Sequence, residues 1–313
     1  MTYIFSLARR IYEHARDLIT GLVYHAATAW VCVVFTLSLF ATEAYVFLKE
    51  SNTNELKVFF LDVGQGDSIL IQTPNQHLVL IDGGASNSAV LSEIGKVIPF
   101  YRKHISIIIS THPDADHIGG LPKVIEKYNP SLFLESGVRS DTWIDKKLRN
   151  GIYQNNIDAI RARRGMKIHF EDTFLEILFP DRNVSEWAKK TNDASIVTRL
   201  EYKDTSFMFT GDSPISIENY LNTAGYLKQT DVLKVGHHGS KTSTMDAFVK
   251  KLSPKHAVIS SGRKNKYGHP HNDVMNILKE NEVTISSTAE CGTIAFKSDG
   301  ARVLPIDESC VVK

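Results

Sequence analysis

A short segment around residue 115 concentrates side chains that can bind metal ions. Four potential ligands fall within six residues, between an apolar run and a pattern with helical spacing: His112, Asp114, Asp116 and His117. In extended chain His112 and Asp114 point the same way, because they are two residues apart. Asp116 and His117 lie on the turn into the helix and can face a second position, which predicts a site for two metal ions. The two aspartates could instead cap the helix, but capping does not explain the histidines.

Two later loops also carry a carboxylate and imidazoles. Asp212 follows the strand-like run FMFTG, where it can either bridge two metal ions or act as a turn residue. Twenty-five residues on, His237 and His238 follow the run LKV with a glycine on either side. A lone histidine on a strand is usually packed in a core. A Gly-His-His-Gly loop without apolar neighbours favours a chemical role.

Further polar residues are candidates for contacts with a substrate. His269 opens the helical pattern NDVMNILKEN and can donate a proton or bind an oxyanion, or it can serve as a polar helix cap. Ser240 and Lys241 follow the histidine loop and could hold a phosphate, although Lys241 could equally be a solvated charge. Asn192 precedes the strand that leads to Asp212 and by itself indicates a turn.

Three more aspartates occur in loops that follow apolar runs: Asp62, Asp67 and Asp82. Each could be a metal ligand. We favour a structural role in which they position the metal-binding loop, because second-shell carboxylates are usual beside metal-bound histidines.

The composition excludes several classes of protein. Apolar residues make up 42% of the 313 residues and charged residues 23%, which excludes wholesale disorder. Lys and Arg number 36 against 35 Asp and Glu, so the chain is not a strongly basic nucleic-acid binder. Three cysteines cannot form a disulfide framework, and the CxxC spacing of zinc fingers is absent.

Alternating strand and helix patterns must position these loops. The runs LKVFFLDV, SILIQT and HLVLIDGG predict a strand meander, followed by the buried strand SIIIST and the helix LPKVIEKY. The second half repeats strand runs interleaved with helical ones. This predicts a layered α/β protein with the sheets inside, and residues 52–313 as a single domain.

The first 51 residues have a different character. Seventeen residues between His25 and Glu43 carry no charge, and apolar neighbours extend the run at both ends. We predict one transmembrane helix over about residues 22–48, with a cleaved signal peptide or a buried soluble helix as alternatives. Three arginines precede the span and two lysines follow it, so the positive-inside rule favours a cytoplasmic N-terminus and an extracytoplasmic domain.

The HPDADH segment resembles the HxHxDH loop of the metallo-β-lactamase-fold hydrolases. That family has an αββα four-layer sandwich and usually a dinuclear metal site. The whole set of motifs looks like the soluble domain of ComEC-type DNA-uptake channel proteins: FLDVGQGDS, LIDGG, THPDADHIGG, ND.S, FMFTGD, LKVGHHGS and YGHPH. Seven motifs occur in the family's order over about residues 56–297. By this resemblance the metal ligands are His112, Asp114, Asp116, His117, Asp212 and His237, with Asp212 bridging.

Two positions depart from the family's pattern. Asp114 replaces the second histidine of the wider superfamily, and Asn192 occupies the region where a further histidine is usual. A carboxylate in place of an imidazole makes the site harder, so manganese competes with zinc for the two positions. One span cannot form a channel, so we do not expect this chain alone to transport DNA.

The resemblance implies metal-assisted hydrolysis. Two divalent ions lower the pKa of a bridging water so that hydroxide exists at neutral pH. Asp116 would orient that hydroxide as well as bind metal. His269, with His238 as the second candidate, would protonate the leaving group.

Three functions are compatible with this chemistry. The first is a phosphodiesterase or nuclease acting on DNA or a related phosphodiester. The second is hydrolysis of a small ester, lactone or choline-phosphate-type substrate. The third is a membrane-anchored binding module without catalysis, against which the intact ligand set speaks. Fold alone does not decide between them.

Overall fold

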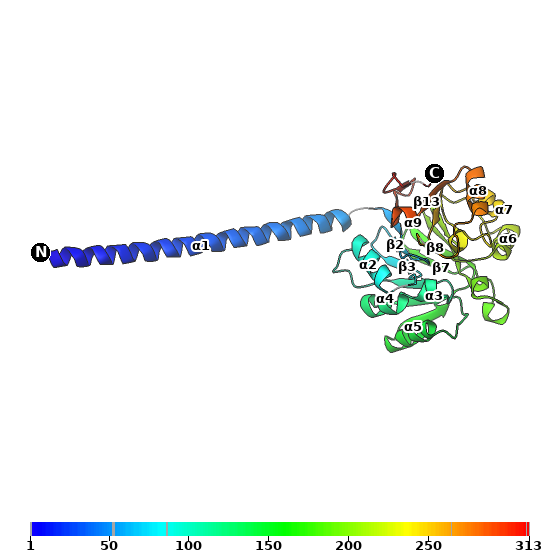
Figure 1. Ribbon diagram of the computed structural model, residues 1–313, viewed down its shortest axis with the longest axis horizontal. Helices are drawn as coiled ribbons and strands as arrows, with labels where there is room; N and C mark the ends of the chain where they lie inside the picture. Colours follow the sequence, from blue (N-terminus) through cyan, green and yellow to red (C-terminus); the bar gives the residue numbers. More distant parts are fainter. Residues whose placement is uncertain (1, 52–53, 86, 264, 311, 313) are drawn as a thin grey trace. The chain divides into compact units, whose positions relative to one another are not determined.

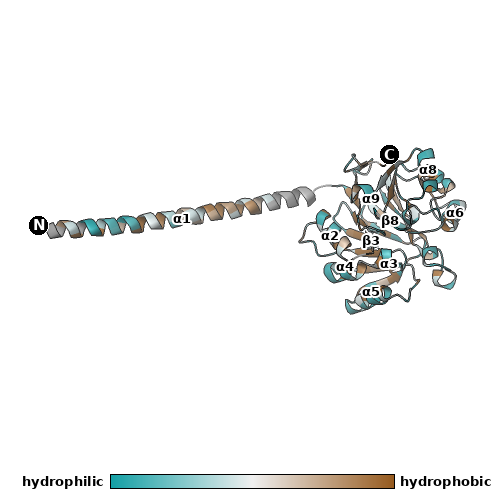
Figure 2. Ribbon diagram, in the orientation of Figure 1, coloured by the Kyte–Doolittle hydropathy of each residue, from teal (hydrophilic) through white to brown (hydrophobic). Residues whose placement is uncertain are grey.

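The computed structural model describes the backbone of residues 2–51, 54–85, 87–263, 265–310 and 312. Two compact units divide the chain, Met1–Thr53 and Asn54–Lys313. The first unit is the helix α1 (Thr2–Ser51), whose apolar middle is brown in Figure 2. Within it, Phe5–Thr42 is long and apolar enough to cross a membrane, by length and composition. The helix extends beyond the predicted 22–48 at both ends because residues 2–51 contain no proline to stop it.

The second unit contains two β-sheets (Figure 1). Among the described residues the first sheet has the strand order β15-β14-β1-β2-β3-β4-β5-β6 and the second has β13-β12-β11-β10-β9-β8-β7. The strands of the first sheet are β1 (Leu56–Phe60), β2 (Ile69–Gln72), β3 (Leu78–Ile81), β4 (Ile107–Ser110), β5 (Leu132–Glu135), β6 (Asp158–Arg161), β14 (Ile294–Ser298) and β15 (Val303–Pro305). Those of the second are β7 (Lys167–Phe170), β8 (Thr173–Phe179), β9 (Val197–Tyr202), β10 (Thr205–Phe209), β11 (Val232–Lys234), β12 (His256–Ile259) and β13 (Thr284–Ser287).

Helices cover the outer face of each sheet. The first sheet packs against α2 (Asn87–Val97), α3 (Ala115–Ile118), α4 (Leu121–Tyr128) and α5 (Trp143–Gln154). The second packs against α6 (Ile215–Thr223), α7 (Asp246–Leu252) and α8 (Asn272–Glu280). A separate apolar cluster fills the space between the sheets, with Phe60 of β1 and Phe209 of β10 at 6.2 Å between ring centroids. The predicted αββα sandwich is therefore confirmed.

Helix α4 illustrates how the sequence directs these layers. Pro122 stands in its first turn, where a missing backbone N–H is tolerated, and Asn129 ends it in the left-handed conformation. Its buried residues recur with helical spacing: Leu121, Val124, Ile125 and Tyr128. This stripe packs against the first sheet, so the amphipathic pattern of LPKVIEKY decides which face is covered.

Parallel strands direct the loops that carry polar residues to one edge. β3, β4, β5 and β6 are parallel in the first sheet, and β10 to β13 are parallel in the second. In such sheets ligands bind beyond the carboxyl ends of the strands. The segments that follow β3, β4, β10 and β11 contain most of the aspartates and histidines singled out in the sequence: Asp82, His112, Asp114, Asp116, His117, Asp212, His237 and His238.

One disulfide joins Cys291, at the end of the short helix α9 (Thr288–Cys291), to Cys310, with 5.8 Å between their Cα atoms. Cys32 in α1 is free. Three cysteines do not make a framework, but they do allow this single bridge, which fastens the C-terminal segment to the sheet edge beside β13.

Candidate metal centre

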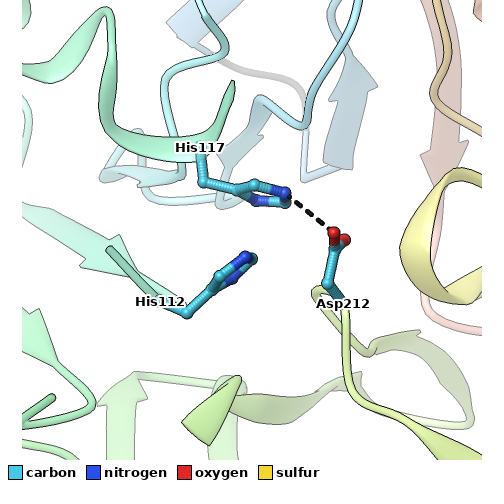
Figure 3. A group of neighbouring side chains, drawn as sticks. All are labelled: His112, His117 and Asp212. Atoms are coloured by element: carbon cyan, nitrogen blue, oxygen red, sulfur yellow. Dashed lines mark ion pairs between the residues drawn. The ribbon is translucent and has the colours of Figure 1, made fainter. Parts of the chain in front are cut away.

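Three buried side chains from two loops converge on one point (Figure 3). His112 follows β4, His117 lies in α3, and Asp212 follows β10. Each can offer a ligand atom within 4.8 Å of the other two. His117 Nε2 is 3.3 Å from Asp212 Oδ2. Imidazole and carboxylate are the donors that zinc and other divalent transition metals take, so this group can hold a cation.

A second group shares His117 with the first. Asp116, His117 and His238 also offer ligand atoms within 4.8 Å of one another. His238 Nε2 is 3.4 Å from Asp116 Oδ2 and 3.4 Å from Asp212 Oδ2. Asp212 therefore lies between the two groups. Asp114 stands at the first one, with Oδ2 3.6 Å from His112 Nε2.

Hydrogen bonds from behind orient His117. Asp82, which has a φ of 58°, accepts a bond from its Nδ1 at 2.8 Å and two more from the backbone and hydroxyl of Thr111. Aspartate tolerates the left-handed region better than most residues, so its use here is understandable. A carboxylate on the far ring nitrogen fixes the tautomer and turns Nε2 toward the site.

Hydroxyl groups hold the opposite wall. His112 Nδ1 is 3.0 Å from Thr111 Oγ1 and 3.3 Å from Ser195 Oγ. Ser195 also accepts the backbone N–H of Asp212 at 3.2 Å. Ser195 therefore links the loop after β4 to the loop after β10.

The histidine loop presents its two imidazoles differently. His237 and His238 both have left-handed backbone angles, with φ of 47° and 57°, and lie in the short turn η3 (Gly236–Gly239). The His238 side chain is 1% exposed and takes part in the ligand groups, whereas the His237 side chain is 28% exposed. His237 Nε2 is nonetheless 3.5 Å from Asp212 Oδ2.

A cleft of about 550 Å³ opens over the converging side chains. Asp114, Asp116, Asn192, His237 and His269 are among the residues that line it. Ser240 and Lys241 are not among the lining residues. Ser240 is buried and accepts a bond from Thr242 Oγ1 at 3.0 Å, and Lys241 is exposed.

Lysines and an aromatic ring stand at the cleft wall. Lys189 and Lys190 line one part of the cleft and are exposed, and within the described part of the chain neither forms an ion pair. Tyr267, 53% exposed, stacks on His269 with 5.7 Å between ring centroids. The cleft thus has cations and a flat apolar ring at the edge of an acidic centre.

Opposite charges within the site shift the pKa values of its imidazoles and carboxylates. Burial alone would lower the pKa of His117, but the carboxylates of Asp212 and Asp82 raise it well above its usual value. Burial would also lower the pKa of His238, but the carboxylates of Asp212 and Asp67 outweigh this effect and raise that pKa to about 9. Burial would raise the pKa of Asp212, yet His238 and His117 hold it well below its usual range. A cation that binds here must displace protons from these imidazoles.

His269 has the opposite environment. Burial lowers the pKa of His269 to about 4, with the charges of His238 and His237 acting in the same direction. The ring is therefore neutral at pH 7 and can donate one N–H to a substrate oxygen.

Unsatisfied buried atoms support metal binding. The Nε2 atoms of His112, His117 and His238, and Oδ1 of Asp212, are buried without a hydrogen-bond partner among the described residues. Buried polar atoms are normally paired, so such a cluster demands an explanation. Divalent cations fit it, because the donors are of the right type and share one point.

The comparison with protein families bears on this site. A family model described as the metallo-beta-lactamase superfamily matches residues 61–263. The chain belongs to this superfamily. Its fold normally binds divalent metals, and the candidate ligand groups lie within the matched region.

Curated relatives include a ComE operon protein and a recombination protein. The chain is 31% identical over 269 residues to ComE operon protein 3 of Bacillus subtilis, which covers 80% of this chain and 34% of that protein. It is 28% identical to recombination protein 2 of Haemophilus influenzae, over 84% of this chain and 30% of that one. The predicted resemblance to ComEC-type proteins is confirmed. The chain spans about a third of the length of these relatives.

Solved structures agree on the fold. YhfI of Bacillus subtilis, a metallo-beta-lactamase fold protein, has a TM-score of 0.52 at 14% identity, covering 79% of this chain and all of that one. CmlA, a diiron β-hydroxylase from Streptomyces venezuelae, has a TM-score of 0.51 at 13% identity, covering 82% and 55%. At such low sequence identity these structural matches show a common fold, the αββα sandwich, and carry no information about the substrate.

Sequence reasoning overlooked one residue of the centre. Lys234 is 0% exposed, and its Nζ pairs with Asp67 and lies 3.9 Å from Asp212 Oδ1. A lysine inside the apolar run VLKV was the available signal, since a buried ammonium needs a partner. Asp62, by contrast, accepts only a turn bond from the backbone of Gly64, at 3.2 Å, among the described contacts.

Proposed function

We propose that this chain is a metal-dependent phosphodiesterase, with DNA or a related phosphodiester as substrate. The observation that carries the proposal is the cleft, which exposed Lys189 and Lys190 line together with residues of the metal-type ligand groups. Lysines suit a phosphate backbone, whereas a small ester or lactone offers them no negative charge. The relatives add support, because a further one, 28% identical, is named competence protein ComA of Neisseria gonorrhoeae, and the motifs resemble those of ComEC-type DNA-uptake proteins.

The proposed assignment uses two divalent ions, zinc or manganese. Asp116, His117 and His238 would hold one, and His112 and Asp114 the other, with Asp212 between them. This places His238 where the motif resemblance put His237, because His238 is the imidazole in the ligand groups. When bound, the ions supply Lewis acidity and a water that ionises near neutral pH.

The chain's own residues position the substrate. Asp116, which lines the cleft, would accept a hydrogen bond from the attacking water. His237 and His269, with 5.7 Å between ring centroids, line the cleft and offer N–H groups to the phosphate or its leaving oxygen. Asn192 also lines it. Ser240 would support the histidine loop by accepting a hydrogen bond from Thr242 Oγ1, and the backbone N–H of Lys241 would do so by donating to His271 Nδ1.

The test is cleavage by the full-length chain in detergent, freed of metal and then given manganese or zinc with labelled single- and double-stranded DNA. We expect cleavage that depends on metal and falls by about a hundredfold or more in Asp212→Asn. Asp158→Asn, an exposed aspartate of β6, is the matched control. If the folded, metal-loaded protein cleaves neither single- nor double-stranded DNA, the proposed nuclease activity is refuted. Small phosphodiesters, lactones and esters would then be tested as substrates.

The membrane part of the proposal concerns α1. We propose that it anchors the chain as a single span, with a cytoplasmic N-terminus and the hydrolase unit, residues 52–313, outside. The apolar stretch and the arginines before it support this. The disulfide also supports it, since such bonds persist in oxidising compartments.

A further inference from the structure

Lys234 is a fully buried cation within the metal centre. It ends β11, its side chain is 0% exposed, and its Nζ ion-pairs with Asp67 Oδ2. The same nitrogen donates to the carbonyl of Gly211 at 3.1 Å and lies 3.9 Å from Asp212 Oδ1. Taking an ammonium out of water costs several kcal/mol unless close partners offset the loss. These three acceptors are therefore the reason the lysine can be there.

The ammonium stands where a further cation could bind. Asp67, Asp212 and His238 offer ligand atoms within 4.8 Å of one another and are all buried. Lys234 Nζ contacts the two carboxylates of this group. Asp67 Oδ1 in turn is 3.3 Å from His238 Nδ1, so Asp67 supports the ring from the side away from Nε2.

Charge balance points the same way. Five aspartates surround the histidines: Asp67, Asp82, Asp114, Asp116 and Asp212. One ammonium leaves four negative charges, which two divalent cations neutralise. Without Lys234 one negative charge would stay uncompensated beside two divalent cations, at the ligand group of Asp67, Asp212 and His238.

The position also joins the two sheets. Asp67 lies in the loop between β1 and β2 of the first sheet, whereas Lys234 is in β11 of the second sheet and Gly211 is in the loop after β10. The contact thus spans the interface on which the centre is built.

We propose that Lys234 is a positioning residue that serves as a built-in cation. Its ammonium permanently fills the position between Asp67 and Asp212, keeps Asp67 from binding metal, and limits the centre to two divalent ions. The inference rests on the metal centre of the proposed function, but not on its substrate.

The test counts bound manganese on the full-length chain in detergent, by equilibrium dialysis and metal analysis. We expect two ions per wild-type chain and three for Lys234→Met, because the freed carboxylates of Asp67 and Asp212 accept one more. Lys234→Arg keeps the charge and should bind two. Asp67→Asn should also bind two, since Asp67 is not a ligand. Lys251→Met, at an exposed lysine of α7, controls for the loss of a positive charge elsewhere.

Several results would overturn the inference. These are two or fewer ions on folded Lys234→Met, three on the wild type, or one on Asp67→Asn. If Lys234→Met does not fold, adding Asp67→Asn removes the unpaired carboxylate. Restored folding with two ions then supports the pairing, and a double variant that stays unfolded contradicts it.

The count separates this inference from the proposed function. Two ions on the wild type and no DNA cleavage would remove the nuclease and leave Lys234 to be judged by its variants. If the wild type cleaves DNA but Lys234→Met binds no more manganese ions than the wild type, the proposed function stands and the inference about Lys234 fails. A wild type that binds no manganese would remove both.

Discussion

The imidazoles of the centre share one arrangement: Nδ1 is held and Nε2 is offered. Nδ1 of His117 bonds Asp82, that of His112 faces two hydroxyls, and that of His238 is 2.9 Å from the Ser260 carbonyl. All three Nε2 atoms are buried without a hydrogen-bond partner among the described residues, and their closest charged neighbours are carboxylates of the site. Orienting partners of this kind fix the tautomer before a cation arrives. Asp82 accordingly orients an imidazole, whereas Asp114 and Asp116 line the cleft.

One buried carboxyl lies behind the histidine loop. Glu218 of α6 is 0% exposed and accepts the backbone N–H groups of Thr244 and Met245, at 2.6 and 2.8 Å. Burial raises the pKa of Glu218 to about 7, although these two bonds act to lower it. The folded chain therefore keeps a proton there between about pH 4.5 and pH 7 that the unfolded chain releases.

Glu218→Gln should remove this titration. A raised folded pKa gives stability that is complete below about pH 4.5 and is lost as the pH rises through about 7. Relative to the wild type, the glutamine variant should gain up to about 3 kcal/mol of stability between about pH 5 and pH 8. Thermal unfolding of the full-length chain at both pH values measures the change. A wild-type-to-variant difference that stays constant with pH would contradict it.

At the scale of elements, the centre depends on loops that approach one another closely. Gly66, between β1 and β2, has a φ of +114°, and a Cβ added there would lie 1.8 Å from the backbone oxygen of Asp116. Gly64, two residues earlier, has a φ of +76° and nothing within 4 Å of its added Cβ. Of these two glycines, Gly66 is the one that lets the loop between β1 and β2 lie directly against the backbone of Asp116.

The pair Gly66→Ala and Gly64→Ala separates backbone strain from contact. Gly64→Ala should cost about 1–2 kcal/mol of stability, from the left-handed angle alone. Gly66→Ala must in addition displace the Asp116 peptide, so it should lose more stability and at least tenfold in manganese affinity. Unfolding midpoints and manganese titrations of both variants are the measurements. Equal metal affinity in the two would show that the close approach does not set the position of Asp116.

Element order and loop positions could be predicted from the sequence, whereas side-chain direction could not. Apolar runs broken by Gly, Asn and Pro predicted β1 to β3, the fully apolar run SIIIST predicted β4, and the polar residues after these runs marked the edge of the site. His237 and His238 are adjacent, and which one turns inward depends on left-handed angles that tertiary contacts impose. Lys234 was missed because its partners come from loops far away in sequence. The helix α1 begins earlier than predicted because hydropathy reports where a span lies, not where the helix starts.

At the scale of the whole molecule, an apolar helix and a hydrolase-fold unit occur in one chain. Phe5–Thr42 and the unit from Asn54 onward are separate bodies, so under the proposed anchoring the compartment of the second unit depends on the orientation of α1. Arg9, Arg10 and Arg16 near the N-terminus favour an extracytoplasmic unit. In an oxidising compartment Cys291 and Cys310 would be joined, and in the cytosol they would be reduced.

Thiol counting on the chain in its own membrane tests this orientation. The chain is denatured and labelled with a thiol-reactive polymer, either without reduction or after it. Without reduction we expect only Cys32 to react, and after reduction we expect all three cysteines to react. Cys32 serves as the internal control, because it is free whichever way α1 is inserted. Replacing the three N-terminal arginines by glutamine leaves only the two lysines that follow the span, which reverses the charge bias and should shift the count toward three reactive thiols. Three reactive thiols in the unreduced wild type would instead place the catalytic unit in the cytosol, where the substrate would be intracellular.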